Sequence, residues 1–306
     1  MGGTGFIGPH VVRRLIERGH DVRVLQRDDT EADPESSDAV VHVCAFSKED
    51  AETAVRLFRG RTGKLVVLSS GDVYRAYGRL QGTETRELEP MPITENSRLR
   101  TTLYPYRDDP KFQNYEKILV ERTVMNVADL PACILRLPAV YGPGDRHHRF
   151  GGWVKQMVNG NVAIQIGAGM AGWRWTHGYV ENVADAIAIA TTDGRTAGRI
   201  YNIGEEAVPT MRERLEAVAE VFGWRGTIEV VRDGMPLDFR QDMAVSTARF
   251  RAELGFADPV SMEEGLLRTI AWERSVTDTS SGRDSTAPGR RADPGSSGRS
   301  ASGPDR

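Results

Sequence analysis

Two hydrophobic periods alternate along this chain. Residues 6–18 place Ile7, Val11 and Leu15 four positions apart, which predicts an amphipathic helix that ends at Gly19. Short apolar runs predict strands at residues 21–25, 39–46, 64–69 and 132–137. Further helical patterns cover residues 49–58, 117–125, 180–191, 211–222 and 262–273. Alternating strands and helices predict an α/β protein with a doubly wound parallel sheet.

Two later stretches depart from this alternation. Residues 143–178 are irregular and rich in Gly, Trp and His. With residues 205–274 they are expected to form a smaller C-terminal substrate lobe over the carboxyl edge of the sheet, where such folds bind ligands. Residues 277–306 contain no aromatic residue and no Val, Ile, Leu or Met, which predicts a disordered tail. The expected organisation is one domain over residues 1–276, followed by that tail.

Composition narrows the class of protein. The 306 residues carry a net charge of −3 with acids and bases interspersed, which gives no electrostatic case for nucleic acid or an anionic membrane. No apolar run approaches the roughly 20 residues of a membrane span, and no signal peptide is visible. Cys44 and Cys133 lie inside apolar runs, which favours buried reduced thiols over a disulfide or a metal pair. The expected location is the cytoplasm.

A glycine pattern, G-x-x-G-x-x-G, stands at Gly2, Gly5 and Gly8. Gly2 would allow a tight turn, Gly5 would let the backbone approach a pyrophosphate, and Gly8 would let the following helix lie close to the sheet. The exposed N–H groups of that helix would hold the phosphates. An ordinary Gly-rich turn is the alternative. Such a motif normally follows a strand, and only Met1 precedes it, so either translation starts upstream or the sheet is damaged.

The residues after the second predicted strand bear on the choice of cofactor. An acid at this position would bind the ribose 2′-hydroxyl of NAD, whereas this chain has Gln26 and Arg27. Arg27 suits a 2′-phosphate, which favours NADP over NAD. The alternative is that Arg27 is a solvated surface residue.

A series of motifs resembles the NAD-dependent epimerase/dehydratase family, the extended short-chain dehydrogenases. The motifs are GGTGFIG, LSSGDVY, KILVE, LRLPAVYGPGD, GYVENVADAI, YNIGEE and ARFRAELGF, in this order over nearly all of residues 2–274. The resemblance implies a Rossmann-like fold that binds NAD or NADP, with Phe6 and Ile7 beside the glycines. It also implies a chain shortened at its front and again between Asp29 and Asp38.

The resemblance places the chemistry on a tyrosine, a lysine and a hydroxyl. Lys117 aligns with the family lysine, but Gln113 stands where the family tyrosine is expected. Tyr115 is the candidate acid/base instead, provided that it lies outside the helix, with Asn114 as a cap. Lys117 would lower the pKa of Tyr115 and anchor the ribose. The alternative is that Tyr115 is a partly buried packing residue.

Ser70 falls where the family hydroxyl binds the reacting oxygen, although a strand-end hydroxyl bonded to local backbone is the alternative. The expected substrate-binding residues are Ser70, Asp72 and Arg174. The resemblance places Arg174 near a family arginine that grips a substrate diphosphate, a role that suits a guanidinium. Pro138 and Val140 are expected near the nicotinamide. The pair His147 and His148 predicts a polar loop and no metal site.

The leading hypothesis is an NAD(P)-dependent epimerase/dehydratase or reductase. Its substrate would be a nucleotide-sugar or a similar hydroxylated metabolite, and the resemblance suggests a homodimer. A nucleotide-binding scaffold or sensor that has lost the chemistry is the second hypothesis, favoured by Gln113. A truncated, inactive family member is the third.

Overall fold

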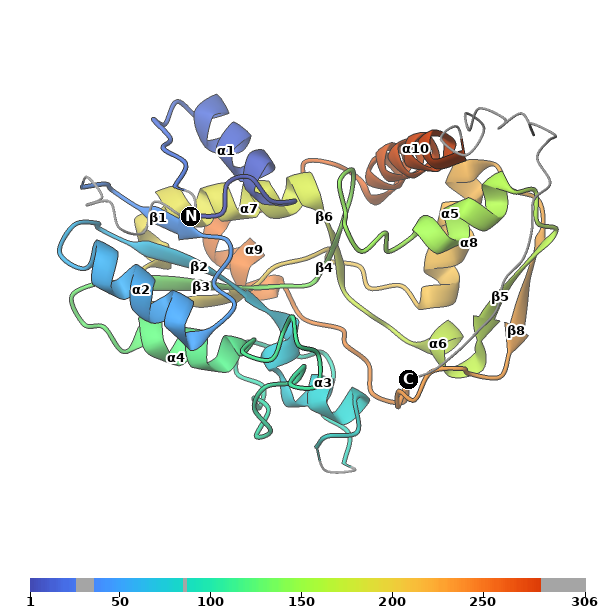
Figure 1. Cartoon of the computed structure of the whole chain (residues 1–306), viewed down its shortest axis with the longest axis horizontal. Coiled ribbons are helices and arrows are strands. Elements are labelled where there is room, and N and C mark those ends of the chain that lie inside the picture. The colour runs from blue at the N-terminus through green and yellow to red at the C-terminus, as the bar shows by residue number, and fades with distance from the viewer. Residues whose placement is uncertain (26–35, 85–86, 282–306) are drawn as a thin grey trace, which may run out of the picture.

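A computed structural model describes residues 1–25, 36–84 and 87–281 (Figure 1). Its strands are β1 (Val40–His42), β2 (Leu65–Ser70), β3 (Ala132–Leu137), β4 (Ala139–Tyr141), β5 (Ala163–Gly167), β6 (His177–Tyr179), β7 (Ile200–Asn202) and β8 (Thr227–Val231). Its helices are α1 (Gly8–Glu17), α2 (Lys48–Phe58), α3 (Arg75–Leu80), α4 (Lys117–Met125), α5 (Gly151–Val158), α6 (Ala168–Gly172), α7 (Val180–Thr192), α8 (Met211–Phe222), α9 (Ala248–Leu254) and α10 (Met262–Ser281). Two short 3₁₀ turns are η2 (Gly71–Val73) and η3 (Gly194–Thr196).

The main sheet is parallel, with the strand order β1-β2-β3-β7. Helices α2 and α4 pack together on one face, and α1 and α7 pack together on the other (Figure 1). Every residue of β3 and all but the last of β2 are buried, as expected for strands covered on both faces. The predicted doubly wound α/β architecture is therefore confirmed, and Cys133 lies in its core.

The outer edge of β1 differs from the prediction. Residues 21–25 do not form a strand. Met1 alone lies between them and β1: its amino group donates to the Val41 carbonyl at 2.7 Å, and the Gly2 amide donates to the Leu25 carbonyl at 3.3 Å. Within the described residues, these isolated bonds form no ladder that residues 21–25 could join as a strand. A groove of about 880 Å³ runs here between α1 and the edge of β1.

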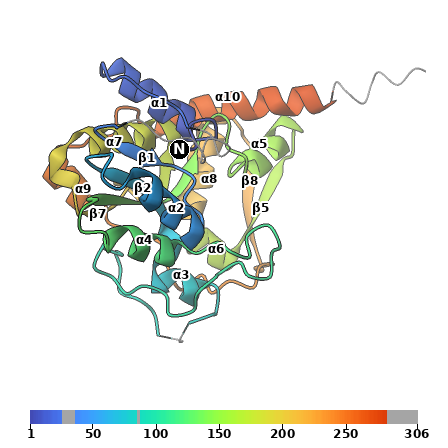
Figure 2. The same ribbon diagram turned by 60° about the vertical axis from the view of Figure 1, so that its left-hand side comes forward.

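A second group of elements stands beside the sheet. Helices α5, α8 and α10 pack on one another, and β5 pairs with β8 in parallel (Figure 2). The prediction that residues 143–178 are irregular was wrong, because they contain α5, β5, α6 and β6. Their short elements, rich in Gly and Trp, carry too little periodic pattern to be recognised. Helix α9, in contrast, packs on β7 of the main sheet.

The last helix is longer than the sequence pattern predicts. Helix α10 continues to Ser281, so the first residues of the predicted tail at 277–306 are helical. The remainder of that segment, residues 282–306, lies outside the described residues. Within the described ranges, no helix is long and apolar enough to cross a membrane.

Candidate active site

The glycine loop runs directly into α1. Gly2 has a φ of +86°, a left-handed conformation that favours glycine. A Cβ on Gly8 would overlap the Gly2 carbonyl and the Gly3 backbone. Gly8 is therefore needed for the loop to fold back on the helix, rather than for contact between helix and sheet. A Cβ on Gly5 would meet nothing closer than 4.0 Å, so Gly5 faces open space.

The amino end of α1 is open. Its N-cap, Ile7, makes no side-chain hydrogen bond, and Pro9 occupies the first turn. The free N–H groups and the helix dipole therefore meet the open space at Gly5, an arrangement that binds anions. Phe6 lies close to Gly144, which places the glycine loop beside the segment that follows β4.

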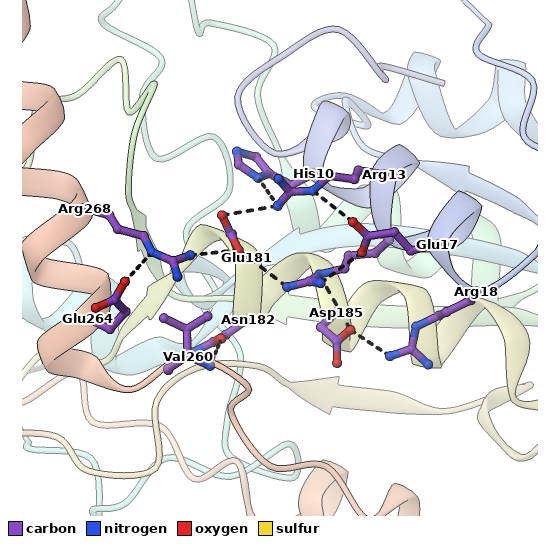
Figure 3. Close-up of polar contacts among 11 residues, drawn as sticks. His10, Arg13, Glu17, Arg18, Glu181, Asn182, Asp185, Val260, Glu264 and Arg268 are labelled. Carbon is purple, nitrogen blue, oxygen red and sulfur yellow. Dashed lines mark hydrogen bonds and ion pairs between the residues drawn. The ribbon is translucent and has the colours of Figure 1, made fainter.

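Ion pairs hold α1 against α7 (Figure 3). Arg18 lies 2.7 Å from Asp185, and Arg13 and Arg14 lie 3.2 Å and 3.5 Å from Glu181. Arg268 of α10 reaches the same Glu181 at 3.3 Å, as Figure 3 shows. These partly buried ion pairs add to the apolar contacts of Val11 and Leu15, the face of α1 that is buried in the main core.

Tyr115 and Lys117 enter the site from the start of α4. Tyr115 lies in the loop before the helix and Lys117 is the first helical residue, so a two-residue offset still brings them together. The cap is Glu116, which accepts from the Ile118 amide, and not Asn114 as expected. Gln113 is exposed in the preceding turn and takes no part in the site.

Lys117 is buried and its ammonium is already occupied. It donates to the carbonyl of Ala45, in the segment after β1, at 2.6 Å and to that of Leu68, within β2, at 2.8 Å. Burial lowers the pKa of Lys117 to about 8, against the pull of the Asp72 charge. The Lys117 ammonium lies 4.8 Å from the Phe46 ring centre and 5.7 Å from that of Tyr115. It therefore faces the ring of Tyr115 without bonding to its hydroxyl.

Ser70 ends β2 and caps the turn η2. Its hydroxyl accepts from the Asp72 amide at 3.2 Å, which is the local backbone bond given above as the alternative. Ser70 also lies beside Tyr115 and the Asp72 carboxyl group, and it acts to lower the pKa of both.

Asp72 lies at the centre of the hydroxyl groups. It is 6% exposed, and its Oδ2 accepts from the Tyr115 hydroxyl at 2.7 Å. Burial raises the pKa of Asp72, while the bond from Tyr115 acts to lower it. Burial and the Asp72 charge raise the pKa of Tyr115 well above 10.0. The expected lowering of this pKa by Lys117 stays a prediction, because burial and Asp72 dominate the shift.

A buried ion pair joins α4 to the main sheet next to the site. Arg136 of β3 bonds both oxygens of Glu121 on α4, at 2.9 Å and 2.7 Å. Ser69 donates to the same Glu121 at 2.5 Å, and Arg136 also reaches the Tyr74 hydroxyl at 3.0 Å. These bonds fix α4 against the strands that end at the site.

The other expected residues lie around this centre. Pro138 follows β3 and packs near Gly178, whereas the Val140 side chain is buried in the main core. Arg174 is 44% exposed on its side chain and donates to the Val208 carbonyl at 2.6 Å, and none of its described contacts is with Tyr115. Arg27 lies outside the described residues.

Sequence reasoning missed the part played by two residue types. The rings of Phe46 and Tyr115 stack with their centres 6.1 Å apart, and the ring of Tyr106 meets that of Tyr115 edge to face with the centres 5.2 Å apart. The segment 104–115 contains Tyr104, Tyr106 and Tyr115. Its density of hydroxyl groups is the signal that could have indicated a polar cluster at the site.

The parallel sheet, with an open glycine loop at its edge and Ser70, Tyr115 and Lys117 together, is the arrangement of Rossmann-type NAD-binding proteins. The model of the NAD dependent epimerase/dehydratase family matches residues 1–73 and 53–204. The chain belongs to this family.

Individual relatives share only part of their length or a modest identity with this chain. A dTDP-glucose 4,6-dehydratase of Streptomyces griseus is 34% identical over 122 residues, which is 39% of this chain and only 35% of the dehydratase. Uncharacterized protein C2A9.02 of Schizosaccharomyces pombe is 27% identical over 271 residues, covering 75% of this chain and 80% of the yeast protein.

Solved structures share the fold. The dTDP-glucose 4,6-dehydratase of Bacillus anthracis, in complex with NAD, has a TM-score of 0.65 at 17% identity and covers 90% of this chain and 96% of its own. RMD from Pseudomonas aeruginosa, complexed with NADPH, has a TM-score of 0.65 at 18% identity, and the match covers 90% of this chain and 98% of RMD.

Proposed function

We propose that the protein is an NAD(P)-dependent epimerase/dehydratase or reductase that acts on a nucleotide-sugar or a similar hydroxylated metabolite. The observation that carries the proposal is the convergence of Ser70, Tyr115 and Lys117 at the carboxyl edge of the sheet. Nucleotide-sugar enzymes among the structural neighbours support the substrate class, since one is named as a complex with UDP-glucose and NAD.

The residues of the glycine loop fit a dinucleotide. Gly2, Gly5, Phe6, Ile7 and Gly8 would hold its diphosphate, because α1 has an uncapped amino end and Gly5 leaves space for a close approach. When bound, the nicotinamide would supply hydride chemistry. Lys117 would contact the ribose.

Pro138 and Val140 would border the nicotinamide, with the contact from Val140 made by its backbone, because its side chain is buried. Arg27 favours NADP in this proposal, and Arg27→Ala is expected to weaken NADP⁺ binding more than NAD⁺ binding.

In the substrate half of the site, Tyr115 would move a proton at the reacting oxygen, and Ser70 would bind that oxygen. Asp72 and Arg174 are proposed to bind further groups of the substrate. The exposed guanidinium of Arg174 suits a diphosphate. A homodimer stays a prediction, which sedimentation velocity of the purified chain would test.

The test is turnover with NAD⁺, NADP⁺ and their reduced forms against a panel of nucleotide-sugars and hydroxylated metabolites. Tyr115→Phe and Lys117→Met are each expected to lower turnover by about 10²-fold or more, the usual worth of a general acid/base. Tyr104→Phe is the control, because the Tyr104 hydroxyl makes no hydrogen bond in the described part of the chain. Undiminished turnover in both variants would reject the roles, whereas cofactor binding with no turnover in the wild type would favour a scaffold or sensor.

A further inference from the structure

A chain of hydrogen bonds leads from Tyr115 through Asp72 to the protein surface. Tyr106 approaches the same Asp72 oxygen as Tyr115, at 3.4 Å, and the hydroxyls of Tyr106 and Tyr77 lie 2.8 Å apart. The exposed Gln81 donates to the Tyr77 hydroxyl at 3.0 Å. Three tyrosines and one carboxylate therefore connect the buried site to solvent.

Between the surface and Asp72, the donors of this hydrogen-bond series all point inward. Tyr106 donates to Asp72, so its oxygen is left to accept from Tyr77. The Tyr77 oxygen in turn accepts from Gln81, whose amide has no proton to pass on. Solvent protons would therefore enter at Tyr77, which is half-buried. Every hydrogen from there inward is oriented toward Asp72, which accepts from both sides.

Asp72 is poised to hold a proton. Its second oxygen, Oδ1, is buried and has no hydrogen-bond partner in the described part of the chain. Arg100, Lys117 and Ser70 face Asp72 and favour its charged form, but burial outweighs them and raises its pKa. A buried carboxylate with a free oxygen takes up a proton more readily than one that is fully bonded.

Tyr115, in contrast, is held as a neutral phenol. The ammonium of Lys117 is bound to two backbone carbonyls, and the partner of the Tyr115 hydroxyl is a carboxylate. The carboxylate partner disfavours a tyrosinate, and the Lys117 ammonium makes no hydrogen bond to the Tyr115 hydroxyl that would favour one. A tyrosine in this state can pass a proton on when its own proton leaves to a neighbour.

We propose that Asp72 is the proton store of the site and that Tyr115 passes protons between Asp72 and the substrate oxygen, with Tyr106 and Tyr77 linking Asp72 to solvent. This proposal rests on the proposed function. When a substrate alcohol is oxidised, its O–H bond breaks as the proton moves to Tyr115 Oη. The O–H bond of Tyr115 breaks in the same step, as its proton moves to Asp72 Oδ2. The hydride goes to an oxidised nicotinamide, and reduction reverses both proton movements.

The test begins with carbon-13 NMR of the full chain, without cofactor or substrate, labelled at the Asp carboxyl and Tyr ring-hydroxyl carbons. Asp72→Asn and Tyr115→Phe assign the two signals. Asp72 is expected to titrate above the ordinary value of about 3.9, and the Tyr115 and Tyr106 signals should move at the same midpoint. An Asp72 titration at or below the ordinary value, or one that leaves both tyrosine signals unmoved, would overturn the proposal.

The second arm is kinetic. Tyr106→Phe interrupts the hydrogen bonds between Tyr77 and Asp72 but leaves Ser70, Tyr115 and Lys117 unchanged. Turnover should therefore fall by about 10²-fold or less, and its solvent isotope effect should rise. Tyr104→Phe, on the same segment, should change neither. An unchanged isotope effect and pH profile in Tyr106→Phe would reject the link to solvent while the enzyme assignment stands. Absence of turnover in the wild type would reject the proposed function, and the NMR titration would still decide whether Asp72 and Tyr115 share their protons.

Discussion

The two halves of the site are supported in different ways. The catalytic half, formed by Ser70, Tyr115 and Lys117, stands on buried strands and on the Arg136–Glu121 pair, whose side chains are 3% and 5% exposed. The glycine-loop half, residues 1–18, borders an open groove and makes partly exposed ion pairs with α7. The comparison shows that the proton-transfer groups are supported by a buried ion pair, whereas the helix behind the glycine loop combines a buried apolar face, Val11 and Leu15, with ion pairs near the surface.

The largest effect is expected from breaking the buried pair in the catalytic half. Arg136→Met leaves Glu121 buried without its partner and should lower the free energy of unfolding by about 3–5 kcal/mol. Arg59→Met is the matched control, since Arg59 makes an exposed pair with Asp129 and its loss should have little effect. Urea denaturation of both variants measures the difference. Equal losses would show that the catalytic half does not depend on this pair.

A smaller loss is expected in the glycine-loop half. Gly8→Ala forces a methyl group against the Gly2 carbonyl and should cost about 1–3 kcal/mol of stability. Gly152→Ala, in α5, has nothing within 4 Å of the added Cβ and should be neutral or stabilising. Thermal unfolding compares the two. A stable Gly8→Ala protein would mean that the loop does not fold against α1 in this way.

Removing the charge of Asp72 should stabilise the catalytic half. The folded-state pKa of Asp72 is raised, so its contribution favours folding below the ordinary value of about 3.9 and is lost as pH rises through the folded value. Asp72→Asn should therefore raise the free energy of unfolding at pH 7, by about 1 kcal/mol. The advantage should shrink as pH falls toward 4. If the gain in free energy of unfolding of Asp72→Asn over the wild type stays constant or grows in acid, the burial of an ionised Asp72 is contradicted.

The smallest effect is expected for the ion pairs at α1. Arg18→Gln removes the contact with Asp185 and should cost less than about 1 kcal/mol at low salt. Because salt screens partly exposed charges, the cost should fall further as ionic strength rises. Urea denaturation at two salt concentrations measures it. A cost that does not change with salt would mean that Arg18 contributes by packing, which removes the contrast between the halves.

The sequence pattern predicted elements well where they depend on local periodicity. Residues 117–125 and 132–137 were predicted with the bounds of α4 and β3. Residues 21–25 have the composition of a strand, but a strand also needs a paired neighbour, and the described part of the chain forms no ladder with them. Local pattern carries no information on such distant pairing.

The candidate site could be predicted only in part, for the same reason. Motif order indicated Ser70, Tyr115 and Lys117. The bonds of Lys117 to Ala45 and Leu68 and the bond from Tyr115 to Asp72 join residues from separate elements. They depend on how the loop before α4 lies across the strand ends, which spacing along the chain does not define.

The central claim, that the glycine loop binds a nicotinamide dinucleotide, is tested most directly by thermal unfolding of the wild type and Gly5→Ala with NAD⁺, NADP⁺ and their reduced forms. Gly5 faces open space, so Gly5→Ala should keep the stability of the unliganded wild type. At about 100-fold excess over Kd, a bound nucleotide should add about 2.7 kcal/mol to the wild type. The account predicts a rise in Tm for the wild type with at least one nucleotide and a clearly smaller rise for Gly5→Ala. No rise in a wild type that unfolds cooperatively, or equal rises in both proteins, would contradict it.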